Sequence, residues 1–185
     1  MLHQIKLTYG RRLARLRQHP ASGGWAQEAG TILSVGPAMG TAGNLKFLYW
    51  ISRGNLGSYL DAISFGEAIG ESPSTAAVRM QRTKDGVGLN FAQRIAPDFG
   101  VLSRVGVSRG TVEAIDLPDI NRSISGGLSL TGSRWGRPDD TFGLAGAINR
   151  ISHQGKLYLA AGGLGGIIGD GQLPNAGREQ ILETF

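Results

Sequence analysis

From residue 84 onward, apolar and polar residues alternate in segments of about ten residues. A period of two is typical of β-strands, because successive side chains of a strand point to opposite faces of the sheet. The pattern therefore predicts an all-β fold. The run GVGLNFAQRI shows it most clearly, with Val87, Leu89 and Phe91 on one face and Gly88, Asn90 and Ala92 on the other.

Candidate strands follow one another along most of the chain, and the connections between them alternate between short and long. The sequence APDFG predicts a tight hairpin turn, because Pro97 suits the second position of a turn and Asp98 tolerates turn backbone. Outer-membrane barrels also have short turns on one side of the membrane and long loops on the other. The predicted strands are 29–36, 44–53, 84–95, 100–108, 121–132, 141–150 and 178–185.

The second face of these strands bears on the choice between a membrane barrel and a soluble domain. In NRSISGGLSLTG and TFGLAGAINR one face is apolar, and the other carries glycine, alanine, serine and asparagine. A soluble sandwich would usually place Lys, Glu and Thr on its water-facing side. The alternation alone leaves both folds open, and the connection lengths favour the barrel. Tyr49, Trp50 and Tyr59 are candidates for an aromatic girdle, with core packing as the alternative.

The composition removes several classes of site. The chain has no cysteine, which excludes thiolate zinc sites, thiol catalysis and disulfides. Its histidines, His3, His19 and His153, lie too far apart for a local metal motif. We therefore expect no metal and no cofactor. No apolar run reaches about 18 residues, so we expect no transmembrane helix. The N-terminal residues also lack the apolar stretch of a secretory signal.

The glycine-rich run KLYLAAGGLGGIIGDGQLPN, at 156–175, does not fit a phosphate-binding loop. Such a loop opens a helix with three spaced glycines. Here Ile168 stands where a third glycine should follow Gly163 and Gly165, and the helix-like part comes first. We expect a short helix inside the long connection after Arg150, with the glycines folding the loop back into a lumen. A surface loop is the alternative.

Several runs are more specific than the alternation. They are GSYLDAI at 57–63 and, from residue 121 onward, GSRWGRPDD, YLAAGGLG, IGDGQLPN and EQILET. Together they resemble the carbohydrate-selective outer-membrane porins of the OprB family. The resemblance covers about 44–185, whereas residues 1–43, with the basic run GRRLARLRQH, match poorly.

The resemblance implies an antiparallel transmembrane β-barrel of porin type around a water-filled pore. From the strands counted above we predict an incomplete barrel of about six to eight strands, with a short helix in a long loop. Residues 44–185 would form this partial barrel domain, after a basic N-terminal segment at 1–43. Because an incomplete wall leaves unpaired strand edges, we expect the chain to be an internal piece of a porin.

The family resemblance implies arginines and acidic groups around a narrow part of the pore, where they contact sugar hydroxyls. A guanidinium offers several donors and a carboxylate offers acceptors, so a sugar is held weakly enough to leave. Strand facing points to Arg104 first. Charge pairing within the wall or a solvated turn position is the alternative for each candidate. The pore-lining candidates are Arg104, Arg94, Asn90, Asn149, Arg122 and Asp170.

The function predicted in this way is passive diffusion of sugars across a bacterial outer membrane, without catalysis. The expected partners are sugars as solutes, outer-membrane lipid and further copies in a homo-oligomer. One alternative is a porin remnant that forms no pore. Another is a basic nucleic-acid-binding module, suggested by the net charge of +5 and the run RRLARLR. A sugar-active enzyme ranks last, because Asp139 and Asp140 sit in a turn without an evident partner carboxylate.

Overall fold

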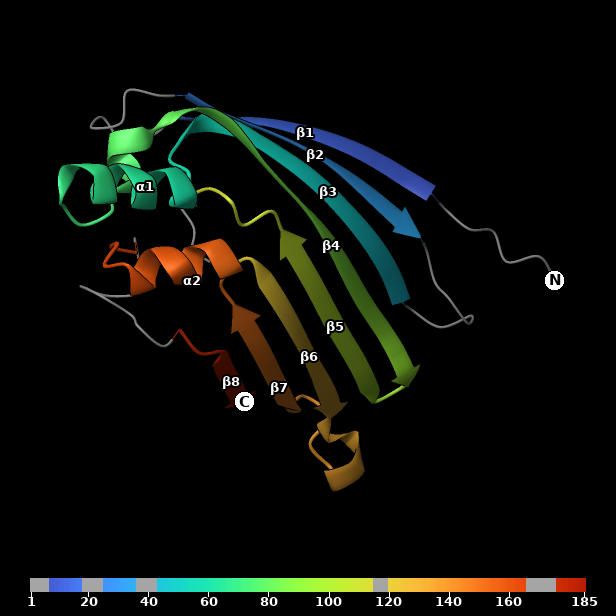
Figure 1. Cartoon of the computed structure of the whole chain (residues 1–185). Helices are drawn as coiled ribbons and strands as arrows, with labels where there is room; N and C mark the ends of the chain where they lie inside the picture. Colours follow the sequence, from blue (N-terminus) through green and yellow to red (C-terminus); the bar gives the residue numbers. More distant parts are fainter. Residues whose placement is uncertain (1–6, 18–24, 36–42, 115–119, 166–175) are drawn as a thin grey trace.

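The computed structural model describes residues 7–17, 25–35, 43–114, 120–165 and 176–185. These residues form an eight-stranded sheet in which each strand pairs antiparallel with the next along the chain (Figure 1). The sheet is open and curved, which confirms the predicted incomplete barrel. Its strands are β1 (Leu7–Arg17), β2 (Trp25–Val35), β3 (Gly43–Leu56), β4 (Met80–Ala96), β5 (Phe99–Ser108), β6 (Arg122–Thr131), β7 (Thr141–Arg150) and β8 (Glu179–Thr184).

From β3 to β8, the short connections lie at one end of the sheet and the long ones at the other. Pro97 and Asp98 alone join β4 to β5, which confirms the predicted hairpin. The register of this pair shifts between Arg94 and Ala96, so Ile95 forms a bulge beside the turn. A one-turn helix, η3 (Gly132–Trp135), lies in the connection between β6 and β7 at the same end.

The long connections carry two α-helices at the opposite end. Helix α1 (Tyr59–Ile69) was not predicted, and η2 (Thr75–Val78) follows it before β4. Ser58 caps α1 by accepting a hydrogen bond from the Asp61 N–H, and Gly70 ends it in the left-handed conformation at φ 72°. Helix α2 (His153–Ala160) is the predicted short helix in the loop after β7.

The buried apolar core lies between the helices. Tyr59 and Ala62 of α1 pack with Tyr158 and Leu159 of α2, and the two tyrosine rings lie 5.3 Å apart. Tyr59 is only 4% exposed, so it belongs to this core and is not part of an aromatic girdle. Among the described residues, no helix has the length and apolarity needed to cross a bilayer.

The two faces of the sheet differ as the alternation predicted. One face, called the apolar face below, exposes large side chains on every strand from β3 to β8; Phe142 and Ile124 are 50% and 52% exposed. The opposite face, the polar face, carries mostly small or hydrogen-bonding residues. The apolar face includes Phe47, Tyr49, Ile51, Val87, Leu89, Val105, Val107, Ile124, Leu128, Phe142, Leu144, Ile148 and Leu182.

The strand registers also divide the three aromatic residues considered for a girdle. Tyr49 pairs with Val87 and lies on the apolar face, where it is 40% exposed. Trp50 is the next residue along β3 and lies on the polar face, opposite Gly86. Of the three, only Tyr49 therefore has the position that a girdle residue needs.

Candidate functional site

A row of hydrogen-bonding side chains crosses the middle of the polar face. Antiparallel pairing places Lys46 of β3 opposite Asn90 of β4, Asn90 opposite Arg104 of β5, and Arg104 opposite Ser125 of β6. Directly paired residues have Cβ atoms about 4.5–5.5 Å apart, so neighbours in the row can act on the same solute. The row, called the Arg104 row below, presents donors from Lys46 and Arg104, and both donors and acceptors from Asn90 and Ser125.

Small residues leave open space beside the Arg104 row. On the side toward the helices, Gly88 pairs with Gly106, and Gly106 pairs with Ser123. A Cβ placed on Gly106 would meet no atom within 4 Å. An exposed guanidinium at Arg104 is therefore not crowded by a neighbouring side chain at that point.

The other predicted pore-lining residues do not all join this row. Arg94 lies on the polar face four residues beyond Asn90, about 13 Å toward the short-turn end. Asn149 is buried on the polar face, and its Nδ2 donates to Oε2 of Glu179 at 2.7 Å, which ties β7 to β8. Arg122 begins β6 in register with Val107, on the side of the sheet that carries Ile124. Asp170 lies outside the described residues.

The long connections meet over the polar face. We call α1, η2, α2 and residues 109–114 and 161–165 the mouth cap. Both helices lie within the arc of the sheet, at the end where β3 and β7 stop (Figure 1). On the polar face beneath them Ser52 and Lys84 are only 2% and 6% exposed, whereas Ile51 on the apolar face is 37% exposed. The mouth cap therefore covers the polar face at the helix end of the sheet and leaves the apolar face there exposed.

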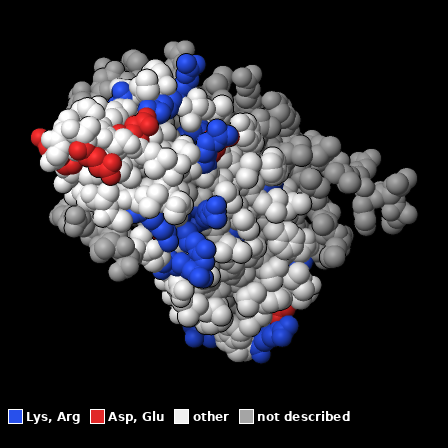
Figure 2. Space-filling model, viewed as in Figure 1, with Lys and Arg blue, Asp and Glu red and all other residues white. Residues whose placement is uncertain are grey.

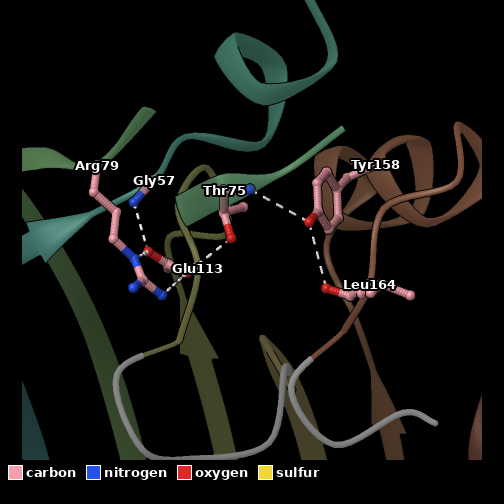
Figure 3. A network of polar contacts seen from close by, with 6 residues as sticks. All are labelled: Gly57, Thr75, Arg79, Glu113, Tyr158 and Leu164. Carbon is pink, nitrogen blue, oxygen red and sulfur yellow. Dashed lines mark hydrogen bonds and ion pairs between the residues drawn. The ribbon is translucent and has the colours of Figure 1, made fainter. Parts of the chain in front are cut away.

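Glu113 joins two of the long connections (Figure 3). Its Oε1 accepts from the Gly57 N–H and from Arg79 Nε, both at 2.7 Å. Its Oε2 accepts from the Thr75 hydroxyl and from Arg79 Nη2, both at 2.9 Å. Desolvation raises the pKa of Glu113, but the hydrogen bonds from Arg79, Gly57 and Thr75 outweigh it, so the pKa lies below its ordinary value.

Tyr158 extends these contacts to the third long connection. Its hydroxyl accepts from the Thr75 N–H and donates to the Leu164 carbonyl oxygen, each at 3.4 Å (Figure 3). A cavity of about 80 Å³ lies between Tyr59, Tyr158, Thr75 and Glu113. It has room for a few water molecules and is too small for a sugar ring.

Charge is distributed unevenly over the face that carries the helices. Figure 2 shows lysine and arginine side chains grouped between the helices and the short-turn end, whereas acidic side chains gather over α1 and the residues after it. The acidic group includes Asp61, Glu67 and Glu71, all of which are exposed. The acidic and basic side chains therefore form two separate groups on this face.

Sequence reasoning did not find Glu113, Arg79 or Thr75, because they lie in connections without periodicity. The turn carboxylates that it did consider lie elsewhere: Asp140 pairs with Arg137 at 2.8 Å in the connection between β6 and β7. In the described part of the chain, no group of three or more His, Asp or Glu side chains could hold a metal ion.

Comparison with known proteins identifies the family of this sheet. The family model described as "Carbohydrate-selective porin, OprB family" matches residues 14–185, which is most of the chain. The match begins within β1, before the region in which the sequence motifs were recognised. No curated protein and no solved structure gives a significant match. The apolar and polar faces, the alternating connections and the family match agree, and the chain belongs to the OprB family of carbohydrate-selective porins.

Proposed function

We propose that this chain forms the wall of an outer-membrane pore through which sugars diffuse passively. The observation that carries the proposal is the division of the sheet into two faces in a chain of the OprB family. Exposed apolar residues on the outer wall are suited to lipid, and an inner wall of small and polar residues is suited to water. Arg137 and the other charged side chains of the connections lie at the two ends of the strands.

The Arg104 row is the proposed sugar-contact region within this pore. Arg104 is exposed and lies between Asn90 and Ser125 across three adjacent strands. A neutral polyol can exchange hydrogen bonds with water for hydrogen bonds with these groups at little net cost, which allows binding and release. Arg94 is exposed on the same face toward the short-turn end, and we assign it a secondary part in the lining. We assign Asn149, which is buried and bonded to Glu179, to joining β7 to β8 beside the pore.

The test is single-channel conductance of the purified, refolded chain in planar bilayers, with sugars added to block the current. We expect discrete conductance steps and transient block by sugars. Arg104→Ala should weaken the block by roughly tenfold, the effect of losing about 1.4 kcal/mol of hydrogen bonding to a charged group.

Arg137→Ala provides the matched control, because it removes an exposed arginine from the short-turn end while the Arg104 row stays intact. It should change the sugar block by less than about twofold. Absence of conductance steps under conditions where another OprB porin conducts would reject the proposal. Equal loss of block in both variants would reject the assignment of the Arg104 row.

A further inference from the structure

The hydrogen bonding of Glu113 is unusual for a carboxylate at the mouth of a pore, because both oxygens are fully used within the protein. A carboxylate offers about four lone-pair sites. Four donors from Gly57, Thr75 and Arg79 occupy them at 2.7–2.9 Å. The Glu113 side chain is 13% exposed and that of Arg79 is 33% exposed, so the carboxylate is largely shielded from water while the guanidinium is partly open to it. A passing sugar could bind Glu113 only by displacing one of these donors.

The donors come from both ends of a long connection. Gly57 follows β3 directly, and Arg79 precedes β4 directly, so Glu113 closes the connection that contains α1 and η2 onto the connection after β5. Thr75 lies between them and also donates its N–H to Tyr158 in α2. Removal of the Glu113 carboxylate would therefore release its bonds to Gly57, Thr75 and Arg79, and would leave Thr75, which also contacts α2, without its side-chain partner.

The strands that precede the two helices lie far apart in the sheet, so contacts between the loops are needed to hold the helices together. Strands β3 and β7 are four places apart in the sheet, about 19 Å along its surface. The helices that follow them nevertheless touch, through Tyr59 and Tyr158. The mouth cap thus bridges the concave side of the curved sheet from β3 to β7, and it lies on the polar face.

We propose that Glu113 is a positioning residue, which holds the mouth cap across the polar face and in this way sets the sugar preference of the pore. The inference about sugars rests on the proposed function; the inference about the mouth cap does not. Glu113 acts through Arg79, Thr75 and Gly57 and does not touch the solute. The solute path is narrowed by the helices that Glu113 keeps in place.

Glu113→Gln is the informative substitution, because it keeps the shape and changes the hydrogen bonding. An amide has one acceptor oxygen and one NH₂ donor. The NH₂ group would face either the Gly57 and Arg79 Nε donors or the Thr75 and Arg79 Nη2 donors. In the first orientation both bonds are lost. In the second the Thr75 hydroxyl can rotate to accept from the NH₂ group, and only the Arg79 Nη2 bond is lost. In either orientation the Arg79 guanidinium loses its counter-charge.

The protein contains no cysteine, so a single introduced thiol can report opening of the mouth cap without background. Ala62 is 0% exposed in the core of the mouth cap, and cysteine is only slightly larger. When the chain has been refolded into detergent, the cysteine of the Ala62→Cys variant should react slowly with a maleimide. With Glu113→Gln added, the reaction should be at least about tenfold faster, the factor for about 1.4 kcal/mol of lost stability.

Asp98→Asn is the matched control. Asp98 also receives two hydrogen bonds from one arginine, Arg134, but at the short-turn end of the sheet. It should leave the labelling of Ala62→Cys unchanged. Equal labelling rates with and without Glu113→Gln would overturn the positioning role. Full labelling of every variant after denaturation, with circular dichroism of the native samples, separates mouth-cap opening from loss of the fold.

Conductance then tests the second half of the proposal. Glu113→Gln should raise the open-channel conductance and reduce the difference between small and large sugars in blocking it. Faster labelling with unchanged conductance and block would show that the mouth cap does not narrow the solute path, and would overturn the role in sugar preference. If no variant, including the parent chain, conducts, the proposed function fails while the labelling experiment still decides the positioning role.

Discussion

Gly86→Ala tests the packing of the polar face at one atom. Gly86 lies on β4 directly opposite Trp50 on β3. A Cβ built on Gly86 would lie 2.7 Å from Nε1 and Cε2 of the Trp50 indole and 2.8 Å from Cζ2. Carbon atoms in contact prefer about 3.5–4.0 Å, so the ring must move or the strands must separate. The indole cannot yield as the end of a flexible chain would, because the clash involves its fused rings.

The size of the effect follows from that overlap. Forcing extra methylene-sized volume into a packed site typically costs about 1–3 kcal/mol. Where the backbone is relaxed and space is open, glycine to alanine instead stabilises by about 0.4–1 kcal/mol through the unfolded state. Gly106, on the next strand and the same face, is such a site, because a Cβ added there would meet no atom within 4 Å. We therefore expect Gly86→Ala to be less stable than Gly106→Ala by about 2 kcal/mol or more.

The assay is urea unfolding of the chain refolded into lipid vesicles, followed by tryptophan fluorescence and by the mobility of unheated samples on SDS gels. Replacement of Trp50 by phenylalanine removes the part of the ring that meets the added methyl group. In the Trp50→Phe background the cost of Gly86→Ala should fall by more than half, because the two residues are coupled. Equal stabilities of Gly86→Ala and Gly106→Ala, or a cost that Trp50→Phe does not change, would refute the placement of Trp50 on the polar face.

Two further outcomes follow from the faces and from the mouth cap. Leu89→Arg, on the apolar face at mid-strand, should lower the free energy of unfolding in vesicles by about 2–4 kcal/mol. Ala92→Arg, on the polar face, should lower it by less than about 1 kcal/mol. Equal losses of stability would argue against lipid on the apolar face. The pKa of Glu113 in the folded chain lies below its ordinary value of 4.5. The ionised carboxylate therefore stabilises the mouth cap above pH 4.5, and this stabilisation is lost as the pH falls through the folded pKa. Near-ultraviolet circular dichroism of the tyrosines should therefore change as the pH falls below 4.5 in the parent chain but not in Glu113→Gln. Arg79 stays charged throughout, and an identical acid transition in both proteins would contradict this role of Glu113.

The strands could be predicted from the sequence because their signal is local. Each residue of β4 and β5 takes its face from its position in an alternating run, and the observed register places Leu89 and Val105 together on one face and Asn90 and Arg104 together on the other. Arg104 was placed on the polar face by the same reasoning. The predicted strands did not include β1, because the run RRLARLR was assigned to a basic N-terminal segment that matched the family motifs poorly.

Helix α1 had a recognisable signal that the strand pattern obscured. Ser58 and Asp61 have the spacing of a capping box, and Gly70 has the place of a C-terminal cap. Tyr59, at the start of this helix, was a candidate for either a membrane girdle or core packing, and the second alternative is confirmed. Tyr59 is buried against Tyr158 of α2, a helix that begins at His153, 94 residues after Tyr59. No local pattern encodes a contact over that separation.

Glu113 had no local signal at all. Its donors lie 34, 38 and 56 positions away in the sequence, and the intervening residues include two strands. A single carboxylate in a loop is common, and only the arrangement of three connections around it distinguishes this one. Contacts of this kind are set by tertiary structure and are therefore outside the reach of periodicity and motif spacing.

The mouth cap also has a consequence for the order of folding. Sheet hydrogen bonds join strands that are neighbours in the chain, so the wall can grow one hairpin at a time with short loop closures. The bonds from Gly57 to Glu113 and from Thr75 to Tyr158 instead span 56 and 83 positions. The first bond can form only after β3, β4 and β5 have paired, and the second only after β4 to β7 have paired and bent far enough to bring their loops together. Closure of the mouth cap is therefore a late event in folding, and it takes place only when the sheet beneath the mouth cap has reached its final curvature.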